Sequence, residues 1–404
     1  MEENRVAENV EDHRLNRFLS KRGLRTTPFL VMEVLERAGE LEKEGRSIIH
    51  LEVGEPDFET PEVVREAGIR AILDGHTHYT HSQGRSELRD AIAEWHLNRY
   101  GTQVSPEQIV VSSGSSTAMV LVFASLLDSG DEVLLTNPCY ACYPKFVSVF
   151  DGVPVGIPVS ESEGFQYPIE AVESQLGRRA KAILLNSPCN PTGTMTSAER
   201  IRSLIEVTDG RVLAISDEIY HGLEYGEKGR SILEFTKDAI VINGFSKLFA
   251  MTGWRLGYAI FPDYMVRAVQ KLQQNLFISA PDFAQIAATA ALTDAADEVE
   301  SMRLEYGVRR SFVLRRLREI GIEIPVEPTG AFYVFINVSR YTQNVLDFTF
   351  QILEQAGVAV TPGVDFGTNG EGFIRICYAN SMEHLEEGMN RLEQFWGGLN
   401  GERI

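Results

Sequence analysis

The sequence lacks several features that mark other classes of protein. No run of residues approaches the roughly 20 consecutive apolar residues of a membrane span. The acidic N-terminus has no hydrophobic stretch of the kind found in secretory signals. Four cysteines in 404 residues are too few for a disulfide framework. We therefore expect a cytoplasmic protein that does not associate with membranes.

Positive charge is also scarce. The chain has 38 lysines and arginines against 57 aspartates and glutamates, which gives a formal net charge of −19. Such a balance argues against nucleic acid or an anionic membrane surface as a partner. The length of 404 residues and an apolar share of 44% are typical of a soluble globular enzyme with two domains around a large core.

Metal-binding patterns are weak. Cys139 and Cys142 form a C-x-x-C pair, but no second such pair or histidine pair lies near them in the sequence, which favours a packing role. His76, His78 and His81 alternate in a loop without clustered carboxylates, which is a poor match to a metal site. We expect no metal.

One segment combines a lysine with groups suited to a phosphate. Lys247 follows residues 239–242, an apolar run that predicts a buried strand. A lysine at a strand end can be partly desolvated, which lowers its pKa and makes its amine available for Schiff-base chemistry. Ser246 and Arg255 add a hydroxyl and a guanidinium, which suit a phosphate. These features predict a covalently held pyridoxal phosphate, although the same residues taken alone fit surface side chains around a glycine-rich turn equally well.

Two other apolar runs also end in polar residues. Residues 182–185 precede Asn190, and residues 212–215 precede Asp217 and Tyr220. Ligands of open α/β sheets bind beyond the carboxyl ends of the strands, so we expect these three side chains at one sheet edge with Lys247. A carboxylate there can pair with a protonated pyridine nitrogen, and the amide and phenol can hydrogen-bond the ring oxygen. The structural alternatives are a turn at Asn190 and a helix cap at Asp217.

These residues carry a resemblance to a known family. The chain resembles the fold-type I pyridoxal phosphate enzymes of the aspartate aminotransferase superfamily, class I/II aminotransferases, from about residue 25 to its C-terminus. The resemblance implies an α/β fold, with a mostly parallel doubly wound sheet in a large domain and a smaller α+β domain. The matching motifs are Gly54-Glu-Pro-Asp-Phe58, Asn190-Pro-Thr-Gly193, Asp217-Glu-Ile-Tyr220, Ser246-Lys247 with Arg255, and Phe373-Ile-Arg-Ile376.

The resemblance implies a role for each cofactor contact. Lys247 would form the Schiff base and later carry the proton, and Asp217 would hold the pyridine nitrogen. Backbone N–H groups of Ser115 and Ser116, where a strand gives way to a helix, would cradle the phosphate. Tyr140 would stack on the ring, and Tyr220 and Asn190 would hydrogen-bond the ring oxygen. The remaining implied cofactor contacts are Ser246, Arg255 and Tyr79, the last reaching the phosphate of the neighbouring subunit in a homodimer with shared active sites.

Substrate contacts are implied in part. Arg375 matches the arginine that takes the substrate's α-carboxylate as a bidentate pair, and Gly54 and Asn190 match its neighbours at that group. The side-chain pocket stays open at this point, with Phe29, Tyr143 and Lys145 as candidates. No residue matches the arginine with which some family members bind a second carboxylate, in the side chain of the substrate. Aspartate, alanine and aromatic amino acids therefore all remain possible amino donors.

The implied activity is transfer of an amino group between an L-amino acid and a 2-oxo acid. The resemblance implies 2-oxoglutarate as the acceptor and a ping-pong mechanism through aldimine and ketimine intermediates. A pyridoxal phosphate-dependent carbon–sulfur β-lyase would use the same Lys247, Asp217 and Arg375. A regulatory protein that binds pyridoxal phosphate is the alternative from another class, but residues 1–53 show no helix-turn-helix pattern.

The order of predicted elements supports this organisation. Short apolar runs alternate with helical segments over residues 109–261, which predicts a doubly wound sheet. Residues 1–24 are charged and aperiodic and predict an N-terminal arm. We assign residues 60–295 to the large cofactor-binding domain, and residues 25–59 with 296–404 to the small domain. Outside the sheet, the pattern predicts helices at 29–41, within 60–100 (two), within 282–320, at 345–357 and at 382–395, and strands at 331–336 and 372–377.

Overall fold

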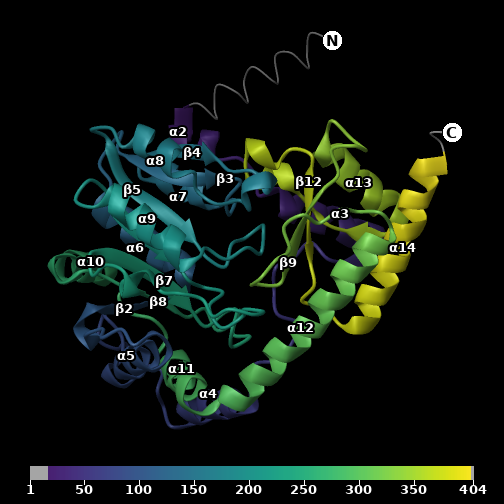
Figure 1. The fold of residues 1–404 in the computed structure, drawn as a ribbon. Coiled ribbons are helices and arrows are strands. Elements are labelled where there is room, and N and C mark those ends of the chain that lie inside the picture. Colours follow the sequence, from purple (N-terminus) through teal and green to yellow (C-terminus); the bar gives the residue numbers. More distant parts are fainter. Residues whose placement is uncertain (1–16, 402–404) are drawn as a thin grey trace.

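The structure, a computed structural model, describes residues 17–401 and is built around a seven-stranded sheet (Figure 1). Strand β8 runs antiparallel to both of its neighbours, β2 and β7, and every other pair is parallel. This topology confirms the predicted mostly parallel α/β sheet. In spatial order the strands are β2 (Ile109–Ser112), β8 (Gly257–Ile260), β7 (Ala239–Gly244), β6 (Leu213–Asp217), β5 (Ala180–Asn186), β3 (Glu132–Asn137) and β4 (Val153–Pro158).

Both faces of the sheet are buried. In β7, Val241 packs into one core cluster, whereas Ile240 and Ile242 pack into another on the opposite face, as strand alternation requires. The second cluster includes apolar residues of α6 and α10. The helices that accompany the sheet are α4 (Glu62–Leu73), α5 (Ser86–Tyr100), α6 (Ser115–Leu126), α7 (Tyr143–Val149), α8 (Ile169–Gln175), α9 (Ala198–Thr208), α10 (Asp263–Leu276) and α11 (Asp282–Asp294).

A smaller unit lies beside the sheet. Figure 1 shows the long helix α12 (Ala296–Glu319) running from α11 toward this unit, where it packs with α14 (Met382–Gly401). The predicted division into two domains stays a prediction. The remaining elements of the unit are α3 (Leu30–Lys43), β1 (Ile49–His50), β9 (Tyr333–Asn337), α13 (Val345–Ala356), β10 (Val358–Ala359), β11 (Thr361–Pro362) and β12 (Phe373–Cys377).

The helices and strands predicted from the pattern are confirmed with small shifts at their ends. The helix expected at 29–41 is α3, and the pair expected within 60–100 is α4 and α5. We predict an N-terminal arm at residues 1–24, of which residues 1–16 lie outside the described residues. The last residues of this range belong to a short helix, α2 (Lys21–Arg25). Among the described residues, no helix is both long and apolar enough to cross a membrane.

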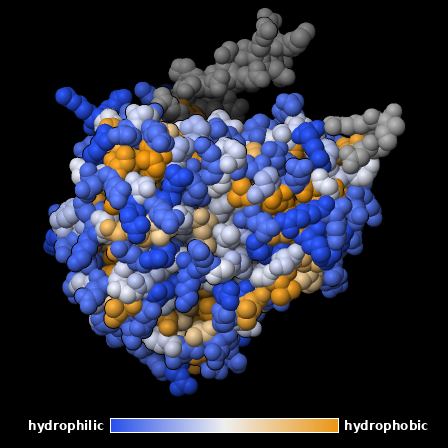
Figure 2. Space-filling model, viewed as in Figure 1, coloured by the Kyte–Doolittle hydropathy of each residue, from blue (hydrophilic) through white to orange (hydrophobic). Residues whose placement is uncertain are grey.

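Several areas of the surface are apolar, and one of them lies over α4 (Figure 2). Figure 2 shows apolar areas along the lower edge of this face, where α4 and the adjacent part of α12 lie in Figure 1. On α4, Ile69, Ile72 and Leu73 are each at least half exposed, with Leu73 at 80%. A group of exposed apolar side chains on a protein surface commonly marks a contact site.

Candidate active site

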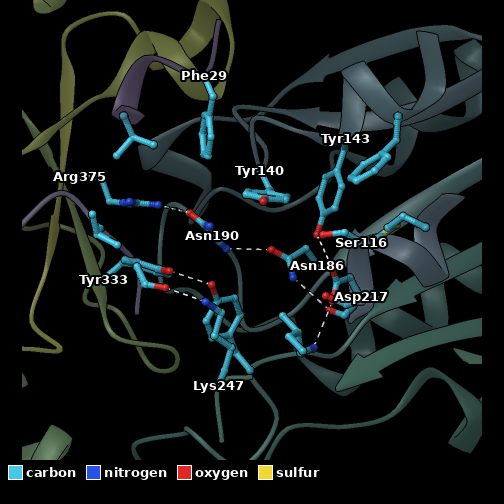
Figure 3. Close-up of a pocket in the computed structure, with 18 of the residues that line it drawn as sticks. Phe29, Ser116, Tyr140, Tyr143, Asn186, Asn190, Asp217, Lys247, Tyr333 and Arg375 are labelled. Carbon is cyan, nitrogen blue, oxygen red and sulfur yellow. Dashed lines mark hydrogen bonds between the residues drawn. The ribbon is translucent and has the colours of Figure 1, made fainter. Parts of the chain in front are cut away.

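Most of the predicted site residues line a cavity of about 220 Å³ at the carboxyl ends of β5, β6 and β7. Figure 3 shows Arg375 and Asp217 at opposite ends of this cavity, with Tyr140 between them and Lys247 on one side. The lining residues are Phe29, Val31, Met32, Val53, Gly54, Ser115, Ser116, Met119, Tyr140, Tyr143, Phe146, Asn186, Asn190, Asp217, Ile219, Tyr220, Lys247, Tyr333 and Arg375.

Lys247 follows β7 closely, as the apolar run before it predicts. Its Nζ donates a hydrogen bond to the backbone oxygen of Gly54 at 2.6 Å. Desolvation is the main cause that lowers the pKa of Lys247 to about 8. Arg375 and Arg255 lower this pKa further by repulsion. Near neutral pH the lysine is therefore still mostly charged, but a larger minority of it is uncharged than for an exposed lysine.

Asp217 ends β6 and is almost completely buried. Its Oδ2 accepts a hydrogen bond from the Tyr143 hydroxyl at 2.7 Å, and its Oδ1 accepts one from the N–H of Ile219 at 3.2 Å. Burial raises the pKa of Asp217 to about 6, against the effect of these hydrogen bonds and of Lys247. The carboxylate is thus in a place where a nearby cation would stabilise its charged form.

Arg375 lies on β12 with most of its donors engaged. Its Nη1 donates to Oδ1 of Asn190 at 2.9 Å, and its Nη2 donates to the backbone oxygen of Glu52 and to Oγ1 of Thr361. Its Nε is buried and has no hydrogen-bond partner among the described residues. The guanidinium also lies 4.4 Å from the ring centroid of Tyr333. This arrangement fixes the guanidinium while leaving it able to bind an anion.

Tyr333 is a site residue that the sequence does not reveal. Its hydroxyl lies 2.8 Å from that of Tyr220, and both rings line the cavity. A Cβ at Gly54 would lie 1.9 Å from the Tyr333 oxygen, so only glycine fits where the backbone of Gly54 meets Lys247. Tyr333 comes from the small unit, 113 residues beyond Tyr220, and no local pattern signals that they meet.

A close-packed turn forms the start of α6. A Cβ on Gly114 would lie 2.8 Å from Nη2 of Arg255, and one on Gly257 would lie 2.6 Å from the backbone nitrogen of Ser115. The two glycines therefore let the helix start, with Ser115 and Ser116, approach the Arg255 guanidinium. The first N–H groups of a helix lack partners within the helix, so this place suits an anion.

Three predicted residues do not line the cavity. Arg255 is exposed beside the α6 start, and Ser246 is buried next to Lys247. Tyr79 is 81% exposed, in the loop between α4 and α5. Its predicted contact with a second subunit stays a prediction.

Two side-chain candidates have other partners in the structure. Tyr143 donates to Asp217, and Lys145 donates to the backbone oxygen of Pro28 at 2.9 Å, with its Nζ 5.5 Å from the ring centroid of Phe29. Phe29 itself points into the cavity between Arg375 and Tyr140 and meets the Tyr140 ring edge-on (Figure 3).

Asn186 is a further missed residue. Its Oδ1 accepts from the Asn190 N–H at 2.8 Å, and its Nδ2 donates to the Asp217 backbone oxygen at 3.1 Å. Asn186 thereby connects the ends of β5 and β6. Its position as the last residue of a predicted strand is the signal that could have identified it.

The described residues show no cluster of three or more metal-ligating side chains. His76 instead lies 3.3 Å from a carboxylate oxygen of Asp282.

Comparison with known proteins identifies the family. The family model for aminotransferase class I and II matches residues 46–392. The chain belongs to the class I/II aminotransferases. It is 42% identical to (5-formylfuran-3-yl)methyl phosphate transaminase of Methanocaldococcus jannaschii, over 93% of this chain and 99% of that protein. It is 36% identical to aspartate aminotransferase of Pyrococcus horikoshii, over 96% and 98%. The solved aspartate aminotransferase of Thermus thermophilus with maleate superimposes with a TM-score of 0.89 at 36% identity, covering 93% of this chain and 99% of that one.

Class I/II aminotransferases are transaminases that use pyridoxal 5′-phosphate, and the cavity suits this cofactor. The buried carboxyl of Asp217 offers a partner for a pyridinium nitrogen. The glycine-lined start of α6 with Arg255 offers a place for a phosphate. The partly deprotonated Lys247 offers an amine, and Arg375, which lines the cavity, offers a guanidinium for a carboxylate.

Proposed function

We propose that this aminotransferase moves an amino group between an L-amino acid and a 2-oxo acid, with Lys247 as the cofactor-binding lysine and the proton carrier. The observation that carries the proposal is the grouping of Lys247, Asp217 and Arg375 around one cavity. Lys247 would supply an amine for the cofactor aldehyde. Asp217 would supply a negative charge for the pyridine nitrogen, and Arg375 a positive charge for the substrate carboxylate. The 2-oxo acid that the family resemblance implies is 2-oxoglutarate.

Bound pyridoxal phosphate supplies an aldehyde carbon for the amine and an electron-withdrawing ring. Lys247 contributes a base near the substrate, because its lowered pKa of about 8 leaves part of the amine uncharged at neutral pH. The Gly54 oxygen, 2.6 Å from Nζ, orients the amine. Lys247 would take the proton from Cα of the substrate and deliver it to the former aldehyde carbon of the cofactor, on the other side of the substrate nitrogen.

Asp217 would hold the proton on the pyridine nitrogen through its negative charge. Tyr143 supports this charge by donating a hydrogen bond to Oδ2. Tyr220 and Asn190 would hydrogen-bond the ring oxygen, and Tyr140 would stack on the ring. Ser115, Ser116, Ser246 and Arg255 would surround the phosphate.

Arg375 would bind the α-carboxylate of the substrate, with Asn190 and Gly54 beside it. Fixing the carboxylate sets which bond at Cα stands perpendicular to the ring, and thereby favours proton removal over decarboxylation. The substrate side chain would lie toward Phe29, Val31 and Met32, an apolar part of the lining. The relatives act on substrates as different as aspartate and a furanyl phosphate, so their names leave the donor open.

We also propose that the enzyme works as a homodimer with shared sites. The exposed apolar residues of α4 and the exposed ring of Tyr79 are neighbours in sequence, which supports a subunit contact at this surface. Tyr79 would reach the phosphate in the partner's site.

A half-reaction screen tests the proposal. The holoenzyme is mixed with each of twenty amino acids, without a 2-oxo acid, while the cofactor absorbance is followed. A transaminase converts the cofactor to its amine form with at least one donor and releases the matching 2-oxo acid. Release of ammonia and pyruvate from cysteine-type substrates, without conversion of the cofactor, would instead identify a β-lyase. No reaction with any amino acid would contradict both.

A further inference from the structure

A buried polar network lies directly behind Asp217 and Tyr220. These two residues line the cavity, whereas Glu218 and His221, which directly follow them in the chain, do not. Glu218 has no exposed surface and His221 is 1% exposed. Neither residue has a task in the reaction as proposed above.

Glu218 is held by donors on one oxygen only. Its Oε1 accepts hydrogen bonds from the Ser231 hydroxyl at 3.1 Å and from the Ile232 N–H at 3.0 Å. Its Oε2 is buried, has no hydrogen-bond partner among the described residues and lies 3.4 Å from Nδ1 of His221. A charged carboxylate with one unsatisfied buried oxygen would be strongly disfavoured.

His221 connects Glu218 to α5. Its Nδ1 lies 2.6 Å from the Tyr100 hydroxyl at the end of that helix. Burial lowers the pKa of His221 to about 3, with a further contribution from the charge of Arg99. His221 is therefore neutral at physiological pH and supplies no positive charge to stabilise an ionised Glu218.

The nearby guanidinium is already paired. Arg99 donates from Nη2 to both carboxylate oxygens of Glu224, at 2.8 and 2.7 Å. Glu224 also accepts from the Gly222 N–H, which fixes the end of the segment. This pair therefore anchors the segment to α5 and leaves Glu218 without a cation of its own.

The remaining groups around Glu218 also disfavour a negative charge there. Burial is the main cause that raises the pKa of Glu218 to about 8, and the charge of the adjacent Asp217 raises it further. Hydrogen bonds from Ser231 and Ile232 act against this rise. From β8, the Tyr258 hydroxyl faces the same network, 3.5 Å from Nε2 of His96.

We propose that Glu218 keeps its proton at neutral pH and acts with His221 and Tyr100 as a set of positioning residues for Asp217 and Tyr220. With Glu218 uncharged, Asp217, which would face the cofactor ring, has no second negative charge directly beside it in the chain. The hydrogen bonds to Tyr100, Ser231 and Ile232 hold the segment from behind. The inference rests on the proposed role of Asp217.

Infrared spectroscopy of the holoenzyme tests the proton directly. We expect a band from a protonated carboxyl group at neutral pH that is lost in Glu218→Gln. The matched control is Glu234→Gln on the neighbouring turn, because Glu234 is paired with Arg230. The control variant should keep the band. A spectrum without this band in wild type, or a band unaffected by Glu218→Gln, would overturn the protonated state.

Kinetics test the positioning role. Glu218→Gln keeps the shape and the uncharged state, so its half-reaction rate should stay within about threefold of wild type. Tyr100→Phe and Glu218→Ala should lower kcat about tenfold while leaving KM for the amino donor nearly unchanged, because the carboxylate site at Arg375 is separate. Equal losses in Glu218→Gln and Glu218→Ala would overturn the inference. Continued borohydride labelling of Lys247 in these variants shows that the proposed function itself still holds.

Discussion

The hydroxyl of Tyr143, at the start of α7, donates a hydrogen bond to the Asp217 carboxylate at 2.7 Å within the buried part of the cavity. Burial raises the pKa of Asp217, and this hydrogen bond is the largest of the interactions that lower it and thereby favour the charged carboxylate. If Asp217 holds the pyridine nitrogen as proposed, Tyr143 would act on the cofactor through this carboxylate.

Replacing Tyr143 with phenylalanine should raise the pKa of Asp217 further, because the hydrogen bond favours the charged form. The acidic limb of the half-reaction rate should move to higher pH, and the rate near pH 6 should fall about tenfold. Stopped-flow measurements across pH check this. The control is Tyr167→Phe, which removes another buried hydroxyl that donates to the Leu184 backbone oxygen. An unshifted acidic limb in Tyr143→Phe would contradict the role given to this bond.

Asn190→Ala removes the acceptor for Nη1 of Arg375 and leaves a buried donor unpaired. We expect kcat/KM for the amino donor to fall about 10- to 100-fold, the range for losing a hydrogen bond to a charged group. Steady-state kinetics measure this. Asn275→Ala, on an exposed part of α10, is the control and should change little. A kcat/KM for Asn190→Ala equal to that of the control would show that Arg375 does not depend on Asn190.

The sequence predicts those parts of the site that follow from single strands. Asp217 and Asn190 follow apolar runs that become β6 and β5, and parallel strands bring their carboxyl ends to one edge. The pairing of Tyr143 with Asp217 could not be predicted, because the two residues are 74 positions apart and belong to different elements. Tyr333 was missed for the same reason. Its meeting with Tyr220 depends on how the small unit packs on the sheet, which local periodicity does not encode.

Stability should fall in mild acid because of buried histidines. Burial is the main cause that lowers the pKa of His96 from 6.5 to about 3. The unfolded chain therefore binds a proton below about pH 6.5 while the folded chain does not, so the free energy of unfolding falls as pH decreases. His96→Gln should make this dependence shallower by up to about 1.4 kcal/mol per pH unit below about pH 6, in the window between the unfolded and the folded pKa. Urea unfolding at several pH values measures the slope, and His78→Gln, at an exposed position, is the control. An identical slope in wild type and His96→Gln would contradict this.

Mixing two inactive variants tests the shared site. Tyr79→Phe and Lys247→Ala subunits should form heterodimers in which one site carries both changes and the other carries neither. Activity should then rise above that of either parent, toward half of wild type per heterodimer. If Tyr79 serves the site of its own subunit, every site keeps one change and activity does not rise. A fully active monomer in sedimentation at assay concentration would also contradict the shared site.

The most direct test of the central claim is the identity of the lysine that binds the cofactor. Holoenzyme is reduced with borohydride, digested, and the labelled peptide sequenced by mass spectrometry. The label should lie on Lys247 alone, and Lys247→Ala should carry no reducible label and no turnover while its folded structure, measured by circular dichroism, is retained. A label on any other lysine of the wild-type chain would contradict the site proposed here.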